Sequence, residues 1–118
     1  MIYGIGLDIV ELGRIKRAVE KNKRFVTRIL TQNEVDIYES LSTDKRKLEF
    51  LAGRFAAKEA LAKALGTGIG KLSFQHIDIL RQKNGAPKVS VQGYEDLTFH
   101  VSITHTDMIA AAQAYAEK

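Results

Sequence analysis

The 118-residue sequence contains no cysteine and only one proline. Without cysteine the chain can form neither disulfides nor cysteine-ligated zinc sites, which fits the cytoplasmic location that we expect. The absence of low-complexity tracts and internal repeats argues against long disordered linkers. No apolar run approaches the ~20 residues that span a bilayer. The start "MIYGIGLDIV" has no basic leader and no cleavage site, so we expect no secretory signal.

Hydrophobic residues make up 45% of the chain, enough for one core, and the length fits a single domain over residues 1–118. The patterns predict a strand over 2–10 and helices over 11–22, 25–30, 31–41 and 44–65. Thr31 and Glu34 have the spacing of a capping box, and Gly66 should end the long helix. Strands are predicted over 74–82, 88–92, 98–104 and 109–116, the first two joined by an Asn-Gly turn. Helices early and antiparallel strands late predict an α+β fold.

Two carboxylates lie in apolar surroundings. Glu59 falls near the middle of an apolar stripe on the long helix, formed by Leu48, Leu51, Ala52, Phe55, Ala56 and Ala62. Asp8 lies in the first strand, where Gly4 and Gly6 leave one face thin enough for another element to approach. An unpaired buried carboxylate costs several kcal/mol, so two converging acids would need protonation or a bridging cation. Oxygen ligands of this kind favour Mg²⁺.

Other interpretations of the same residues remain open. Lys63 follows Glu59 by four residues, and a simple helix salt bridge between them would be worth about 0.3–0.5 kcal/mol. The segment "GTGIGKLS" lacks the spacing and the Ser or Thr of a phosphate-binding loop, and "GIG" lacks the third glycine of a dinucleotide motif. The three histidines show no paired-histidine zinc pattern. From the residues alone, the acids indicate a metal-dependent protein that handles an anionic phosphate ligand.

The net charge of +4 is unevenly distributed. Residues 13–28 carry seven basic side chains and only one acidic one, a local charge of +6, which leaves −2 for the rest of the chain. This window predicts an anionic partner, although a solvated helix face or a nucleic-acid surface would look similar. Because Phe25 is the only aromatic residue in the window, we expect no nucleic-acid partner.

The segments "GIGLDIVELGRI" (residues 4–15) and "FAAKEALAKAL" (residues 55–65) resemble the holo-acyl-carrier-protein synthases, the small bacterial phosphopantetheinyl transferases. "LTQNEVDIY", "FLAGRFAAKEA", "GTGIG", "NGAP" and "HVSITHT" are similar to that family in the same order. The resemblance implies transfer of 4′-phosphopantetheine from coenzyme A to a serine of acyl carrier protein, with release of 3′,5′-ADP. It also implies a homotrimer with active sites at subunit interfaces, which composition and periodicity do not show.

The resemblance further implies roles for individual residues. Asp8 and Glu59 would bind Mg²⁺, and Lys63 would contact the phosphates and support the leaving group. The adenosine and pyrophosphate end of coenzyme A would lie near Gly85, Pro87, Ser102, Thr104 and His105. The base that accepts the serine proton is left open among a metal-bound water, ranked first, and Glu59, Asp36 or His105. Acyl carrier proteins are acidic, so Arg14, Arg24 and Arg28 in the basic window are the expected docking contacts.

Overall fold

The computed structural model describes residues 1–118 and contains two antiparallel sheets and four α-helices. Strand β1 (Ile2–Glu11) leads into helices α1 (Leu12–Lys21), α2 (Arg24–Ile29), α3 (Gln32–Ser40) and α4 (Asp44–Ala64). A short 3₁₀ helix η1 (Phe74–His76) precedes strands β2 (Ile77–Arg81), β3 (Pro87–Val91), β4 (Thr98–His105) and β5 (Ile109–Glu117). No helix is long and apolar enough to cross a membrane. The predicted α+β fold is confirmed.

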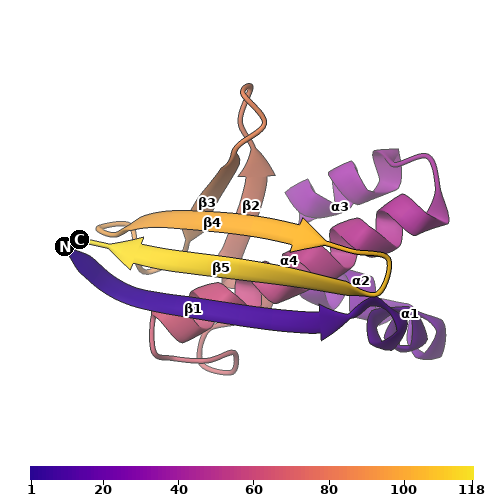
Figure 1. The fold of residues 1–118 in the computed structure, drawn as a ribbon, viewed down its shortest axis with the longest axis horizontal. Helices are drawn as coiled ribbons and strands as arrows, with labels where there is room; N and C mark the ends of the chain where they lie inside the picture. Colours follow the sequence, from indigo (N-terminus) through magenta and orange to yellow (C-terminus); the bar gives the residue numbers. More distant parts are fainter.

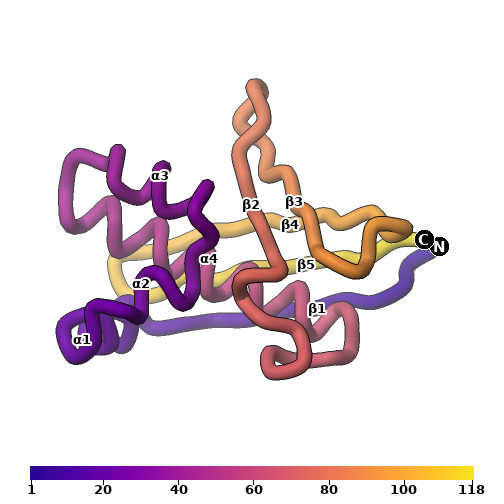
Figure 2. Tube along the Cα trace, turned by 180° about the vertical axis from the view of Figure 1, so that it is seen from behind, coloured from indigo at the N-terminus to yellow at the C-terminus, as the bar shows by residue number.

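The first and last strands of the chain lie side by side. The larger sheet has the order β1-β5-β4, with Asp8 opposite Ala112 and Ala112 opposite Ile103, so both termini lie at one end of it (Figure 1). Strands β2 and β3 form a separate two-stranded sheet that projects away on the β4 side (Figure 2). The predicted hairpins are confirmed, including the β4–β5 pair, and Gly85 in the β2–β3 turn has a φ of 86°, which favours glycine.

Helix α4 crosses one face of the larger sheet obliquely. Near its middle Gly53 faces Ile103 on β4, whereas Ala60 and Ala64 further on contact Gly6 and Gly4 on β1. A Cβ atom on Gly6 would lie 1.8 Å from the Ala60 carbonyl oxygen, and the same distance separates a Cβ on Gly4 from the Ala64 oxygen. The prediction that the glycine face of the first strand admits a close neighbour is therefore confirmed.

Two details of the sequence prediction need correction. The segment predicted as a strand from residue 74 begins as the 3₁₀ helix η1, which Ser73 caps by accepting a hydrogen bond from the Gln75 amide. The buried surface of α4 is also wider than the predicted apolar stripe, because it includes Ala57, Lys58, Ala60 and Leu61. The sheet covers one side of α4, while α2 and η1 approach it from another, so its C-terminal half is enclosed nearly all round.

Candidate active site

Asp8 and Glu59 come together where α4 packs on β1. Asp8 is half-buried on the inner face of β1, in the same row of side chains as Gly4 and Gly6. Glu59 is also half-buried and directly precedes Ala60, the residue that contacts Gly6. Burial raises the pKa of Glu59, and the nearby Asp8 carboxylate raises it further. The two acids, 51 residues apart along the chain, therefore share one electrostatic site.

Two cations lie close to this acid pair. Lys63 Nζ is 3.1 Å from Asp8 Oδ1 and donates a hydrogen bond of 2.9 Å to the Leu7 carbonyl oxygen. Lys63 and Arg14 both lower the pKa of Glu59 and so oppose the effects of burial and Asp8. The ion pair of Lys63 is thus with Asp8 on β1, and the helix salt bridge to Glu59 that the sequence allowed is absent. The Lys63 side chain remains half-exposed, which leaves it accessible to a ligand.

The donor set matches a hard divalent cation with few protein ligands. No cluster of three or more His, Cys, Asp or Glu side chains able to hold a metal is present. Mg²⁺ is usually held by one or two carboxylates together with waters and substrate phosphates, so a pair of acids suffices for it. Burial, and then the Asp8 carboxylate, hold the pKa of Glu59 above its usual range, and a bound cation would oppose both effects. Asp8 and Glu59 therefore fit such an ion better than a fully protein-ligated metal.

A second candidate site is a cleft between α4, β4 and the β2–β3 sheet. Its volume is about 670 Å³, and its lining includes Gly85, Pro87, Ser102 and His105 from the expected coenzyme A residues. Thr104 is exposed on β4 but does not line the cleft. His105 Nδ1 lies 3.6 Å from Glu49 Oε2 on α4.

Asp8, Glu59 and Lys63 do not line this cleft. The oblique path of α4 explains the separation, because Glu49 lies toward its β4 end and Glu59 toward its β1 end. Within one chain the predicted site residues therefore form two groups.

Three arginines give the cleft a positive lining that the sequence analysis missed: Arg46, Arg54 and Arg81. Arg54 is buried in α4, where its Nε donates a 3.2 Å hydrogen bond to the Ile79 carbonyl oxygen and its guanidinium stacks on Phe50. Glu49 is the only acid among the lining residues. The sequence did contain one sign that Arg54 is buried. Small residues surround it on α4 (Ala52, Gly53, Ala56 and Ala57), and such a run indicates that other elements pack closely against the helix there.

The fully buried charge on α4 belongs to Lys58 and not to Glu59, the residue that the sequence singled out. Lys58 Nζ lies 2.6 Å from Glu34 Oε1, and both side chains are fully shielded from solvent. Lys58 also donates hydrogen bonds to the carbonyl oxygens of Ile29 and Phe74. Glu34 completes the predicted capping box with Thr31 and accepts a further bond from the Ile79 amide. Every buried side-chain donor and acceptor thus has a partner.

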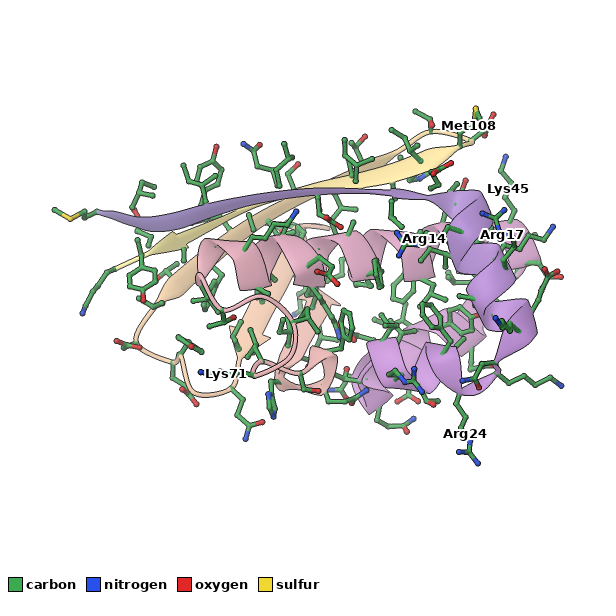
Figure 3. The ribbon with its side chains drawn as sticks, turned by 90° about the horizontal axis from the view of Figure 1, so that it is seen from below. Arg14, Arg17, Arg24, Lys45, Lys71 and Met108 are labelled. Atoms are coloured by element: carbon green, nitrogen blue, oxygen red, sulfur yellow. The ribbon has the colours of Figure 1, made fainter.

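The expected docking arginines lie at the helical end of the molecule. Figure 3 shows Arg14 on the side of α1 that faces α4, whereas Arg24 points away from the body. Arg24 begins α2 and Arg28 lies in its last turn. Asp36, one of the candidate bases, is exposed on α3 and accepts a 2.9 Å hydrogen bond from Gln32.

Residues 4–116 match the family model of the 4′-phosphopantetheinyl transferase superfamily. The chain is 57% identical to a holo-[acyl-carrier-protein] synthase of Bacillus subtilis, covering 100% of this chain and 98% of that relative. Among solved structures it resembles the holo-(acyl-carrier-protein) synthase of Bacillus anthracis in complex with CoA (3′,5′-ADP), with a TM-score of 0.91 and 44% identity over 100% of this chain and 98% of that one. It also resembles the Helicobacter pylori holo-[acyl-carrier-protein] synthase in complex with coenzyme A, with a TM-score of 0.84 and 34% identity. That match covers 96% of this chain and 99% of the other.

Proposed function

The chain belongs to the 4′-phosphopantetheinyl transferase superfamily, and we propose that it transfers 4′-phosphopantetheine from coenzyme A to a serine hydroxyl of an apo-acyl carrier protein. Residues 1–118 would act as one transferase domain. The observation that carries this proposal is the meeting of Asp8 and Glu59 beside Lys63, in a chain that matches coenzyme A-bound relatives over its full length. That site combines the anionic and cationic groups that a diphosphate substrate with a divalent cation requires.

The reaction exchanges the phosphoanhydride bond of the coenzyme A diphosphate for a phosphoester bond to the serine oxygen. The serine oxygen forms a bond to the phosphorus that carries pantetheine, while the bond from that phosphorus to the bridging oxygen of the diphosphate breaks. The hydroxyl proton is lost, and 3′,5′-ADP leaves with the electron pair of the broken bond. When bound by Asp8 and Glu59, Mg²⁺ would neutralise negative charge that develops on the phosphoryl oxygens. Lys63 would supply a positive charge to the same oxygens, because its side chain is half-exposed and its ammonium group, which binds Asp8 and the Leu7 carbonyl oxygen, has a third donor to offer.

The cleft provides the features needed for the adenosine end of coenzyme A. Arg46, Arg54 and Arg81 offer positive charge for phosphate groups, and planar guanidinium groups bind phosphate oxygens in pairs. Gly85 and Pro87 shape the β2–β3 turn at the cleft edge. Ser102 and His105 add polar groups from β4, and Thr104 lies nearby on the same strand.

The separation of the cleft from the acid pair supports the expected homotrimer. The outer face of β1 presents Tyr3, Ile5, Leu7 and Ile9 with 54–61% of each side chain exposed, an apolar row typical of an interaction surface. Figure 3 shows side chains of the sheet that point away from α4, with Met108 at one end of this face. Association through this face would bury the apolar row, and the resemblance to the family implies that each complete site would then be shared between subunits.

The function is tested by incubating the protein with coenzyme A, Mg²⁺ and an apo-carrier protein and weighing the carrier by mass spectrometry. We expect the carrier to gain the mass of phosphopantetheine and 3′,5′-ADP to accumulate in equal amount. Chelation of the metal, Asp8→Ala and Glu59→Ala should each abolish the gain. Glu39→Ala, which removes an exposed carboxylate from α3, is the matched control and should stay active. A carrier that is not modified by the wild-type protein would contradict the proposal.

A further inference from the structure

Helix α2 is held at its C-terminal end by two side chains from distant parts of the sequence. Gln75 Nε2 lies 2.7, 3.2 and 2.8 Å from three carbonyl oxygens, and Lys58 Nζ donates a 2.8 Å bond to a fourth. The acceptors are consecutive, those of Thr27, Arg28, Ile29 and Leu30. An amide has two N–H groups, so Thr27 and Leu30 take the two short bonds from Gln75 and Arg28 shares one of them. We call Gln75 and Lys58 the α2 clamp.

The α2 clamp compensates for a weakness that is built into a helix of this length. Helix α2 has six residues, whereas isolated helices shorter than ~12–15 residues are marginal in water. The last carbonyl groups of any helix lack partners within the helix and need donors from elsewhere. At the N-terminal end of α2 the N-cap residue Lys23 makes no side-chain cap, whereas Asn22 Oδ1 accepts a 3.0 Å hydrogen bond from the Arg24 amide. The buried side chains of Ile29 and Leu30 anchor α2 to the core, while the α2 clamp fixes the carbonyl groups at its C-terminal end.

The same helix carries two of the three arginines expected to contact the carrier protein, Arg24 and Arg28. The clamp ties this helix to η1 through Gln75 and to α4 through Lys58, the residue directly before Glu59. A docking helix is thereby fixed to the helix that carries one of the proposed metal ligands. Arg14 is different, because it belongs to α1, which neither Gln75 nor Lys58 touches through a side-chain hydrogen bond.

We propose that Gln75 and Lys58 are positioning residues that hold α2 in the orientation in which Arg24 and Arg28 meet the acyl carrier protein. This inference rests on the proposed function. If the clamp is lost, the C-terminal turn of α2 is no longer held in one orientation, and the carrier is then bound without defined contacts from Arg24 and Arg28. The chemical step should not change once the carrier is bound, because α4 and the acid pair keep their own contacts with β1.

Gln75→Ala is the variant of choice, since Gln75 is exposed whereas Lys58 is buried with Glu34. We expect the KM for apo-carrier protein to rise about fivefold, the effect of losing one to two hydrogen bonds. The kcat at saturating carrier and the KM for coenzyme A should stay within twofold of wild type. Gln92→Ala removes an equivalent exposed amide at the end of β3 and should change none of the three constants.

A double-mutant comparison separates positioning from a general loss of stability. In the Gln75→Ala background, Arg28→Ala should add little to the carrier KM, because α2 no longer presents Arg28 in a fixed place. Arg14→Ala should keep its full effect on that KM in both backgrounds. Fully additive effects of Gln75→Ala and Arg28→Ala would overturn the proposal.

Amide hydrogen exchange provides a readout that needs no enzymatic activity. Amides of residues 24–30 should exchange faster in Gln75→Ala than in wild type or Gln92→Ala, while those of α4 remain protected. Unchanged exchange in residues 24–30 would refute the clamp even if the transferase assay succeeded. A wild-type protein that does not modify a carrier, by contrast, would count against the proposed function, and the exchange result would then decide on the clamp by itself.

Discussion

The carbonyl oxygen of Ala60 lies where only a glycine at position 6 can face it, because a Cβ atom there would come within 1.8 Å. This contact sets the distance between α4 and β1 and hence brings Glu59 toward Asp8. The site is therefore a consequence of backbone packing, and changes to that packing should affect stability and activity together.

Gly6→Ala should destabilise the protein by about 3 kcal/mol, since the added methyl group meets backbone and forces α4 away from the sheet. Urea denaturation would measure the change in the free energy of unfolding, and the transferase assay should show a parallel loss of activity. Gly13→Ala is the control, because its Cβ would meet only the mobile end of Arg17 at 3.3 Å. An alanine there should be neutral or stabilise α1 by up to about 1 kcal/mol. Equal effects at both positions would contradict this account.

Lys58→Met should be among the most damaging substitutions in the protein. It leaves the Glu34 carboxylate buried and without its cation, which typically costs about 3–5 kcal/mol. Glu34→Gln in the same chain should recover part of the loss, because a neutral amide needs no counter-charge. Denaturation of the two single variants and the double variant gives the coupling energy between the side chains. Strictly additive losses would show that the ion pair contributes nothing of its own.

Glu59 should make the metal-free protein less stable as the pH rises. Its pKa in the folded protein is raised, first by burial and then by Asp8, so the folded state binds a proton where the unfolded state has lost it. The contribution to stability is fully present below the ordinary glutamate pKa and is lost as the pH rises through the higher folded value. Glu59→Gln should therefore have a higher Tm than wild type at neutral pH in the presence of a chelator. The difference should shrink toward zero at a pH of about 4, and a constant difference would argue against the shift.

Arg24→Glu should raise the KM for the carrier protein while leaving the KM for coenzyme A nearly unchanged, because Arg24 points away from the body of the protein (Figure 3). Raising the ionic strength should weaken the wild-type interaction in the same way. Arg14→Glu should have a second effect on kcat, since Arg14 also acts on the charge of Glu59. Steady-state kinetics with each substrate varied in turn would separate the two cases. A carrier KM unchanged in Arg24→Glu would remove Arg24 from the docking surface.

Ile5→Glu should prevent self-association through the outer face of β1. The side chain is 57% exposed in the single chain, so a charge there can be solvated by the monomer but not by an apolar interface. Light scattering after size-exclusion chromatography would report the mass, and we expect a folded monomer with little transferase activity. Gln92→Glu introduces the same charge in the turn that follows β3 and should leave the assembly intact. An Ile5→Glu protein that stays oligomeric would place the interface elsewhere.

Local patterns in the sequence were sufficient to predict most elements of this fold. The capping box at Thr31 and Glu34 formed as predicted, and Gly66 follows the end of α4 with a positive φ of 76°. The glycine pattern of β1 predicted a close neighbour, and the convergence of Asp8 with Glu59 followed from it. The capping box, the end of α4 and the glycine face of β1 depend on interactions within a few residues or on the alternation of side chains along one strand, so the sequence by itself determined them. The packing of α4 on that glycine face then brought Glu59 toward Asp8.

Only the tertiary structure decided which charges are buried and with whom they pair. Periodicity placed Glu59 on the apolar stripe of α4, but the fully buried charge is Lys58, because α2 and η1 enclose the helix on the side away from the sheet. Lys63 pairs with Asp8 and not with its helical neighbour Glu59, since β1 lies closer to its ammonium group. The arginine-lined cleft likewise brings together α4 and two separate sheets. A sequence pattern defines the faces of one element, whereas the partners of each face depend on how distant segments pack against it.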